Sequence, residues 1–344
     1  MKVFFSPTQK MHRPAQFLVA GKFRPNPDVP ERAERFLTGI ANEGHQIAEP
    51  QDFGTRYVAS VHAANYVDFL SQAYGAWAKM PNASSEVVPN VHPRRAGKAY
   101  PTSIVGRAGY HLSDLACPIS ENTWEASLWG AHSATAAALA VRDDGQDFAY
   151  AMCRPPGHHA GADFAGGFCY INNAAIAAEI MRKRFDKVAI VDVDVHHGNG
   201  TQEIFYDRAD VLFTSLHGDP NDFYPFFWGY ADETGIGEGV GANANFPLPR
   251  HTSDDVYLDT LGRALQKVRD FGAQAVVVSL GLDSYKDDPL AFLKITTDGF
   301  RRIAKALAEV KLPTVLVQEG GYMCDDLGRN LAAFLASYQT ARAS

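Results

Sequence analysis

Residues 188–200 read VAIVDVDVHHGNG, an apolar run that ends in two carboxylates and an imidazole: Asp192, Asp194 and His196. In a β-strand successive side chains alternate between the two faces, which would place all three on the same face. Such groups lose hydration when they are buried together, and a bound cation offsets that cost. The spacing therefore predicts a cation site, although a polar strand end that enters a solvated loop would give the same pattern.

A second apolar run, AVVVSLGLD over residues 275–283, also ends in an acid, Asp283. Ligands from neighbouring parallel strands meet at the carboxyl edge of an open α/β sheet. Asp194, His196 and Asp283 would supply two carboxylate oxygens and one imidazole nitrogen. Three protein ligands with an open fourth position are typical of catalytic zinc, whereas structural zinc has four protein ligands. A lone strand-end acid can instead cap a helix, but the pairing of the two runs favours a zinc ligand.

Two further segments carry groups suited to proton transfer and to charge stabilisation. The turn RPPGHH ends in His158 and His159, and histidine can take a proton from an activated water and pass it to a leaving amine. Tyr322 follows two glycines in the segment EGGY. Glycine permits a backbone conformation closed to other residues, so the phenol could donate a hydrogen bond to a developing oxyanion. Taken alone, the segments could equally be a surface histidine pair and a tyrosine packed near a strand end.

These segments need a scaffold that brings several strand ends together. Strand-like and helix-like segments alternate, which predicts one α/β domain with an open, mostly parallel sheet flanked by helices. The expected strands cover residues 2–5, 147–153, 187–195, 209–215, 275–281 and 313–317. The expected helices cover residues 30–43, 62–77, 125–141, 172–184, 253–271 and 297–310.

Two long segments fit this alternation poorly. Residues 75–122 are rich in proline and polar residues, and residues 219–241 are rich in aromatic residues and glycine. Long irregular segments in a compact domain are usually functional, disordered or contacts between subunits. We expect both segments at the surface, near the site that the strand ends create.

The composition excludes several classes of protein. The net charge of −7 over 344 residues argues against nucleic-acid binding, which needs a basic surface, and favours cationic small molecules. No apolar stretch approaches the roughly 20 residues of a membrane span, and the first ten residues do not resemble a signal peptide. We therefore expect a cytoplasmic protein. The cysteines are scattered, which predicts free thiols at Cys117, Cys153, Cys169 and Cys324.

Together the motifs resemble those of the histone deacetylase and acetylpolyamine amidohydrolase superfamily. RPPGHH, GGFCYINN, DVDVHHGNGTQ, SLHGDP, SLGLD and EGGY occur in the order of that family and span nearly the whole chain. The segment YPFFWGY at 224–230 and the insertion at 75–122 resemble the bacterial acetylpolyamine amidohydrolases most closely. The resemblance implies an arginase/deacetylase fold over residues 1–344 and hydrolysis of N-acetylated polyamines or diamines to free amine and acetate.

The resemblance also implies roles for individual residues. His159 would act as general base and then general acid, and His158 would be its electrostatic partner, oriented by Asp192. Tyr322 would polarise the acetyl carbonyl. One Zn²⁺ per chain would bind to Asp194, His196 and Asp283. Iron or cobalt could occupy the same ligands, because availability as well as geometry decides which metal is loaded.

Further residues follow from the same resemblance. Phe168 and Tyr224 would form the walls of a narrow substrate tunnel, and Arg32 would lie near its inner end. A structural K⁺ would bind to Asp192, to Ser215 and to the backbone carbonyls of Asp194, His196 and Leu216. The insertion at 75–122 would form a homodimer contact that restricts the mouth of the tunnel.

The chain departs from the family pattern at two places. Asn199 stands where many protein deacetylases have an aspartate, which predicts a lower pKa for His159. The region around Val105 and Ala116 lacks the acids that contact polyamines in some relatives. Nearby acids that could replace them in binding the distal ammonium are Asp114, Glu121 and Asp222.

Three alternatives stay open from the sequence. Acetyl-lysine in proteins or peptides is the principal alternative substrate. A dimanganese ureohydrolase shares the fold but needs further carboxylates that bridge two metal ions. The positions two residues after His196 and Asp283 hold Gly198 and Tyr285, which are not carboxylates, so one metal ion fits better than two. A non-catalytic sensor of acetylated amines would be expected to lack Tyr322, a ligand or the histidine pair, all of which are present.

Overall fold

The protein is built around one eight-stranded sheet, seen here in a computed structural model that describes residues 1–93 and 99–344. The strand order is β4-β1-β5-β10-β9-β6-β7-β8, and every neighbouring pair is parallel. The strands are β1 (Lys2–Phe4), β4 (Gln46–Ala48), β5 (Phe148–Ala151), β6 (Val188–Asp192), β7 (Val211–Gly218), β8 (Asn243–Leu248), β9 (Ala275–Leu280) and β10 (Thr314–Gln318).

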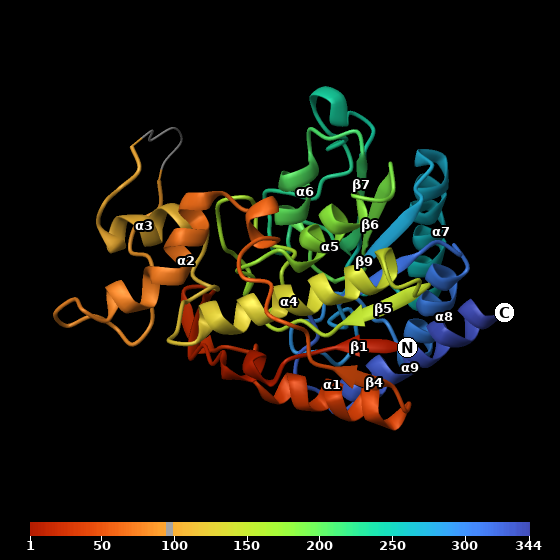
Figure 1. Cartoon of the computed structure of the whole chain (residues 1–344), viewed down its shortest axis with the longest axis horizontal. Helices are drawn as coiled ribbons and strands as arrows, with labels where there is room; N and C mark the ends of the chain where they lie inside the picture. The colour runs from red at the N-terminus through yellow and green to blue at the C-terminus, as the bar shows by residue number, and fades with distance from the viewer. Residues whose placement is uncertain (94–98) are drawn as a thin grey trace.

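Helices cover both faces of the sheet (Figure 1). One face carries α4 (Thr123–Arg142) and α5 (Asn173–Met181); the other carries α1 (Glu31–Asn42), α7 (Asp254–Phe271), α8 (Thr297–Ala308) and α9 (Leu327–Ala343). The continuously apolar sequence of β9 follows from burial on both faces. Ala275 and Val277 pack in the core on the face with α4 and α5, whereas Val276 and Val278 pack in the core on the opposite face. A parallel strand that is buried on both faces requires this composition.

The remaining elements lie outside the eight-stranded sheet. Figure 1 shows α2 (Ala64–Trp77) and α3 (Ile104–His111) side by side at the end of the molecule opposite the C-terminus. Strands β2 (Gln16–Val19) and β3 (Lys22–Pro25) form an antiparallel hairpin. The others are α6 (Asn199–Phe205) and the short 3₁₀ helices Pro7–Met11, Val58–Ser60 and Gly237–Gly239. No helix among the described residues is long and apolar enough to cross a membrane.

The predicted sheet and the six predicted strands are confirmed, with small shifts at their ends. The prediction that residues 75–122 are irregular throughout is wrong, because α3 lies within them and Val87 pairs with Ile119. Residues 94–98 of this insertion lie outside the described residues. The irregular segment at 219–241 is confirmed apart from one 3₁₀ turn.

One structural argument from the sequence needs correction. Strand β6 ends at Asp192, which pairs with Ser215 on β7 and with Ser279 on β9. Asp194 and His196 therefore lie in the loop between β6 and α6, and strand alternation does not explain where they point. The loop itself brings them together, because the backbone N–H of His196 donates to Asp194 Oδ1 at 2.9 Å.

Candidate active site

The candidate catalytic residues follow four adjacent strands of the sheet, β5, β10, β9 and β6, at their carboxyl ends. The histidine pair follows β5, the segment EGGY follows β10, Asp283 follows β9, and the loop containing Asp194 follows β6. All parallel strands point the same way, so these four segments converge at one edge. The sheet thereby brings together residues that are far apart in the sequence.

Three predicted zinc ligands form one buried cluster. One ligand atom from each of Asp194, His196 and Asp283 lies within 4.8 Å of the other two. His196 Nδ1 is 3.2 Å from Asp194 Oδ1 and 3.3 Å from Asp283 Oδ2. Asp283 Oδ2 is buried and, apart from its proximity to His196 Nδ1, has no hydrogen-bond partner among the described residues. A buried carboxylate oxygen without a donor is costly, so the donor set and this oxygen both fit a bound cation.

The electrostatics of the cluster lead to the same conclusion. Burial, followed by the neighbouring charge of Asp194, raises the pKa of Asp283. Burial alone would lower the pKa of His196, but Asp194 and Asp283 raise it to about 9. The two carboxylates thus compete for positive charge in a site that excludes water. A divalent cation would supply that charge and would leave the imidazole neutral, as a ligand must be.

Backbone N–H groups hold the proposed ligands in place, and the lack of a side chain at Gly320 leaves room for them. The N–H of Gly320 donates to Asp194 Oδ2 at 2.8 Å, and the N–H of Val195 donates to Asp283 Oδ1 at 3.1 Å. A Cβ atom at Gly320 would overlap both Asp283 Oδ2 and Asp194 Oδ2. Gly320 is therefore needed for space beside the ligands.

We expect Gly320→Ala to weaken zinc binding. Loss of an outer partner of a metal ligand typically costs about 10–100-fold in affinity, and displacement of two ligands should cost at least that much. Competition with a chromophoric chelator measures the affinity. The matched control is Gly262→Ala on α7, where an added Cβ meets no atom within 4 Å. Equal zinc affinity in the two variants would contradict the packing argument.

The histidine pair lies directly beside this cluster. The ring centroids of His158 and His159 are 4.0 Å apart. His158 Nδ1 is 3.0 Å from Asp192 Oδ2, and its Nε2 is 3.8 Å from Asp194 Oδ1. Burial would lower the pKa of His158, but the carboxylates of Asp194 and Asp192 raise it to about 10. In this arrangement His158 carries the positive charge of the pair.

His159 has the opposite character. Its Nδ1 lies 2.7 Å from Asn199 Oδ1, the neutral residue at the position where an acid was expected from the resemblance. Burial, and then the positive charges of His158 and His196, hold the pKa of His159 well below its usual range. If Nδ1 donates to Asn199, the lone pair on Nε2 is free to accept a proton. The two rings therefore differ in charge: the pKa shifts favour the protonated form of His158 and the neutral form of His159.

We expect Asn199→Asp to move the acidic limb of the pH profile to higher pH. A carboxylate beside Nδ1 stabilises protonated His159, so its pKa rises. Only the neutral form can act as a base, so activity would then be lost at a higher pH than in the parent protein. The profile of kcat/KM against pH measures the shift. Asn199→Ser, which adds no charge, serves as the control, and an unmoved limb in Asn199→Asp would argue against His159 as the base.

Tyr322, two residues after Gly320, is held in place by contacts that the sequence did not reveal. Its backbone N–H donates to Asp288 Oδ2 at 2.7 Å, and Gly321 before it has a φ of 115°. Arg32 donates from Nε to Gly321 O at 2.5 Å, and its Cζ lies 4.6 Å from the centre of the Tyr322 ring. Burial raises the pKa of Tyr322 well above its usual value, so the phenol stays protonated and can donate.

Arg32 is in turn held by a buried group of charges. Asp28 Oδ1 accepts from Arg154 Nε at 2.9 Å and also forms an ion pair with Arg32. All three side chains are buried. Asp28 and Asp288 belong to none of the sequence motifs, and Arg154 begins the motif RPPGHH without a role that the motif reveals; only the folded chain shows that they support Tyr322.

The two predicted tunnel residues lie beside the catalytic candidates. The Phe168 ring centroid is 5.8 Å from that of Tyr322, and the Tyr224 centroid is 5.0 Å from that of His159. The Tyr224 hydroxyl donates to Asp114 Oδ2 at 2.6 Å, and the N–H of Gly167 donates to the same oxygen at 3.0 Å. Asp114 thus ties the insertion to the tunnel wall.

The other two acids considered for ammonium binding make no such contact with the tunnel residues. Asp222 is exposed and lies 3.5 Å from Arg250, and Glu121 is exposed at the surface. For the predicted potassium site, the structure places Asp192 opposite Ser215 in the sheet, with Leu216 buried next to it. Asp192 Oδ1 also accepts from the N–H of Asp194 at 3.1 Å.

Comparison with known proteins identifies the family of this chain. The model of the histone deacetylase domain matches residues 26–338. A curated acetylpolyamine amidohydrolase of Burkholderia pseudomallei is 45% identical over 99% of this chain and 100% of its own length. One from Mycoplana ramosa is 41% identical over 97% of this chain and 98% of its own length.

Solved structures give the same result. A crystal structure of acetylpolyamine aminohydrolase from Burkholderia pseudomallei superposes with a TM-score of 0.96 at 44% identity, and 99% of each chain is covered. The HDA15 HD domain superposes with a TM-score of 0.81 at 27% identity, covering 100% of this chain and 91% of that one. By its sequence over almost the full length and by its fold, this chain belongs to the histone deacetylase domain family.

Proposed function

We propose that the protein is a zinc-dependent amidohydrolase that converts N-acetylated polyamines or diamines to free amine and acetate. The observation that carries the proposal is the buried cluster of Asp194, His196 and Asp283 beside the paired rings of His158 and His159. The proposal is further supported by curated relatives at 45% and 41% identity, which are named acetylpolyamine amidohydrolases.

In the proposed mechanism each residue has a separate task. Bound zinc would supply Lewis acidity toward the acetyl carbonyl and toward a water molecule. Neutral His159 removes a proton from the attacking water and later delivers it to the leaving nitrogen. Charged His158, oriented by Asp192, stabilises the negative charge that develops beside it. The protonated phenol of Tyr322 donates a hydrogen bond to the oxyanion.

The proposed substrate is a slender acetylated amine. Phe168 and Tyr224 place aromatic rings next to Tyr322 and His159, which suits an aliphatic chain better than a bulky group. The net charge of −7 favours cationic ligands. Acetyl-lysine in peptides remains the alternative, because it presents the same acetylated aliphatic amine to the zinc.

A panel of substrates separates these two possibilities. We would measure kcat/KM of the zinc-loaded protein on N-acetylputrescine, N-acetylcadaverine, acetylspermidine and an acetyl-lysine peptide. The proposal predicts a clear preference for the small free amines. Equal or faster cleavage of the peptide would reassign the protein as a lysine deacetylase, whereas no cleavage of any acetylated amine would remove the proposal.

We also propose the potassium site and the homodimer. Asp192 and Ser215, adjacent in the sheet, would bind K⁺ together with the backbone carbonyl of Leu216 and neighbouring carbonyls. The protein should then unfold at a higher temperature in K⁺ than in tetramethylammonium.

The proposed homodimer contact lies in the insertion at 75–122. Val91 in this insertion is 58% exposed, as expected for a residue that a second copy covers. Light scattering should report a dimer that Val91→Asp weakens, and a monomeric parent protein would exclude this contact.

A further inference from the structure

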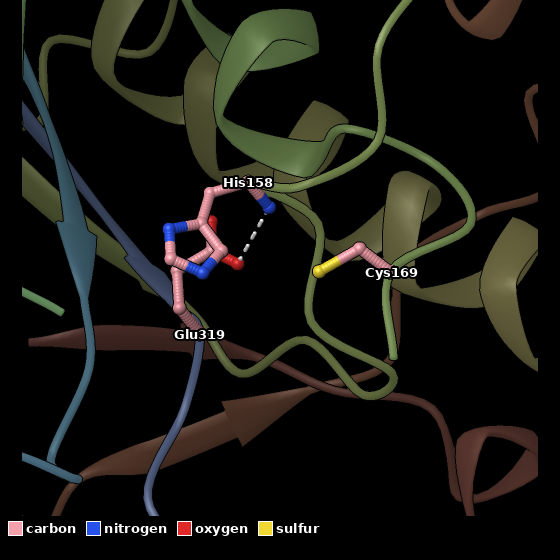
Figure 2. Close-up of side chains that lie close together, drawn as sticks. All are labelled: His158, Cys169 and Glu319. Carbon is pink, nitrogen blue, oxygen red and sulfur yellow. Dashed lines mark hydrogen bonds between the residues drawn. The ribbon is translucent and has the colours of Figure 1, made fainter. Parts of the chain in front are cut away.

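A second group of metal-binding side chains lies beside the proposed zinc ligands. Cys169, Glu319 and His158 each offer a ligand atom within 4.8 Å of the other two, and all three are buried. Figure 2 shows the three side chains converging from separate segments, with the sulfur of Cys169 directed toward the other two. Nothing in the proposed mechanism uses Cys169 or the carboxylate of Glu319.

Only one of the two carboxylate oxygens of Glu319 accepts hydrogen bonds from the described residues. Its Oε2 accepts from the N–H of Gly157 at 2.6 Å and from the N–H of His158 at 3.1 Å. Its Oε1 is buried and has no hydrogen-bond partner in the part of the chain that the structure describes. The side chain is 0% exposed, so bulk water does not solvate that oxygen. Glu319 thus combines a fully buried oxygen without a partner with a place in a group of ligand-bearing side chains, and both features fit a bound cation.

The three donors form a set that zinc prefers. A thiolate, a carboxylate oxygen and an imidazole nitrogen are all common zinc ligands, and water can complete the shell. Burial raises the pKa of the Cys169 thiol well above its usual value, so the residue is a thiol until a metal arrives. Coordination would release the thiol proton of Cys169 and one ring proton of His158 to the buffer and would bind the thiolate and the neutral imidazole. The thiolate also distinguishes this set from the proposed catalytic ligands, which contain no sulfur.

The position of the cluster determines its effect on catalysis. His158 Nε2 is 3.8 Å from Asp194 Oδ1, so a cation that reaches the catalytic ligands is already next to the second set. A metal on His158 would occupy a ring that the proposed mechanism uses directly beside His159. It would also place a second divalent charge beside His159, whose ring centroid lies 4.0 Å from that of His158.

We propose that His158, Cys169 and Glu319 form a second zinc site whose occupation inhibits the enzyme. Zinc above one equivalent per chain binds there and lowers the rate, so the protein is active over a limited range of free zinc. The inhibition rests on the proposed amidohydrolase activity, but the binding does not, and the two can be tested separately.

Cobalt spectroscopy tests the binding without any substrate. Metal-free protein is titrated with Co²⁺, and the near-ultraviolet band from thiolate-to-cobalt charge transfer is followed. The first equivalent should give no such band, because the catalytic ligands lack sulfur. The second should produce it in the parent protein and in Cys153→Ser, a control at another buried cysteine, but not in Cys169→Ser. Absence of the band at the second equivalent, or its persistence in Cys169→Ser, overturns the site.

Zinc titration of the active protein tests the inhibition. Loss of even an outer partner of a ligand costs about 10–100-fold in metal affinity, so Cys169→Ser should raise the half-inhibitory zinc concentration at least about tenfold. Glu319→Gln should do the same, because its amide oxygen can still accept from the two backbone N–H groups. Activity at excess zinc is compared with activity at one equivalent within each variant. Inhibition at the same zinc concentration in the parent protein and both variants would overturn the inhibitory role.

Discussion

Tyr322→Phe should reduce kcat by about 10²–10³, the usual cost of removing one donor to an oxyanion. The substitution deletes only the hydroxyl. The phenyl ring can keep its contacts with Arg32 and Phe168, and the backbone can keep its hydrogen bond to Asp288. Because the hydrogen bond strengthens in the transition state, we expect KM to change much less than kcat.

Two measurements separate this effect from a change in structure. Zinc content should remain at one per chain, since Tyr322 is not among the proposed ligands. The thermal unfolding temperature should change little, since no packing atom is lost. Unchanged kcat in a zinc-loaded, folded variant would remove Tyr322 from the mechanism.

His159→Ala should lower kcat/KM by about 10²–10⁴, the range that a positioned general acid–base contributes. The residual activity should also lose the acidic limb of its pH profile, because the base that titrates there is absent. The parent protein and the variant are compared across pH at one equivalent of zinc.

The neighbouring Asn199 supplies the control for this prediction. Asn199 Oδ1 lies 2.7 Å from His159 Nδ1, so Asn199→Asp should shift the pH profile only when His159 is present. A double-mutant cycle detects this dependence. A shift that persists in the double variant would show that another group titrates, and His159 would lose its assigned role.

The sequence predicted the part of the site that lies at strand ends. Parallel strands buried on both faces have a continuous apolar composition, and β9 and β10 both show it before Asp283 and Glu319. A polar residue directly after such a run is conspicuous. The carboxyl ends of neighbouring strands must lie close together, so proximity followed from topology alone. The sequence wrongly extended strand β6 to Asp194 and beyond. The strand ends at Asp192 because its pairing with β7 and β9 ends there, and pairing cannot be inferred from the sequence of one strand.

The residues that support the site could not be predicted in this way. Arg32 contacts Gly321 and Asp28 contacts Arg154 across long sequence separations, and none of these contacts depends on a local pattern. Asp114 was considered only as a ligand for an ammonium group, yet in the fold it accepts a hydrogen bond from Tyr224. Helices α3, α6 and α9 were also missed; α3 and α6 are short, with 8 and 7 residues.

The most direct test of the proposed function is a zinc titration of the metal-free protein with N-acetylputrescine as substrate. Activity should be absent without metal, rise linearly and reach its maximum at one zinc per chain. Asp283→Asn should need much more zinc, because it removes the negative charge of the unpartnered Oδ2. Full activity without metal, or a maximum only at two zinc ions per chain, would contradict a single catalytic zinc bound by Asp194, His196 and Asp283.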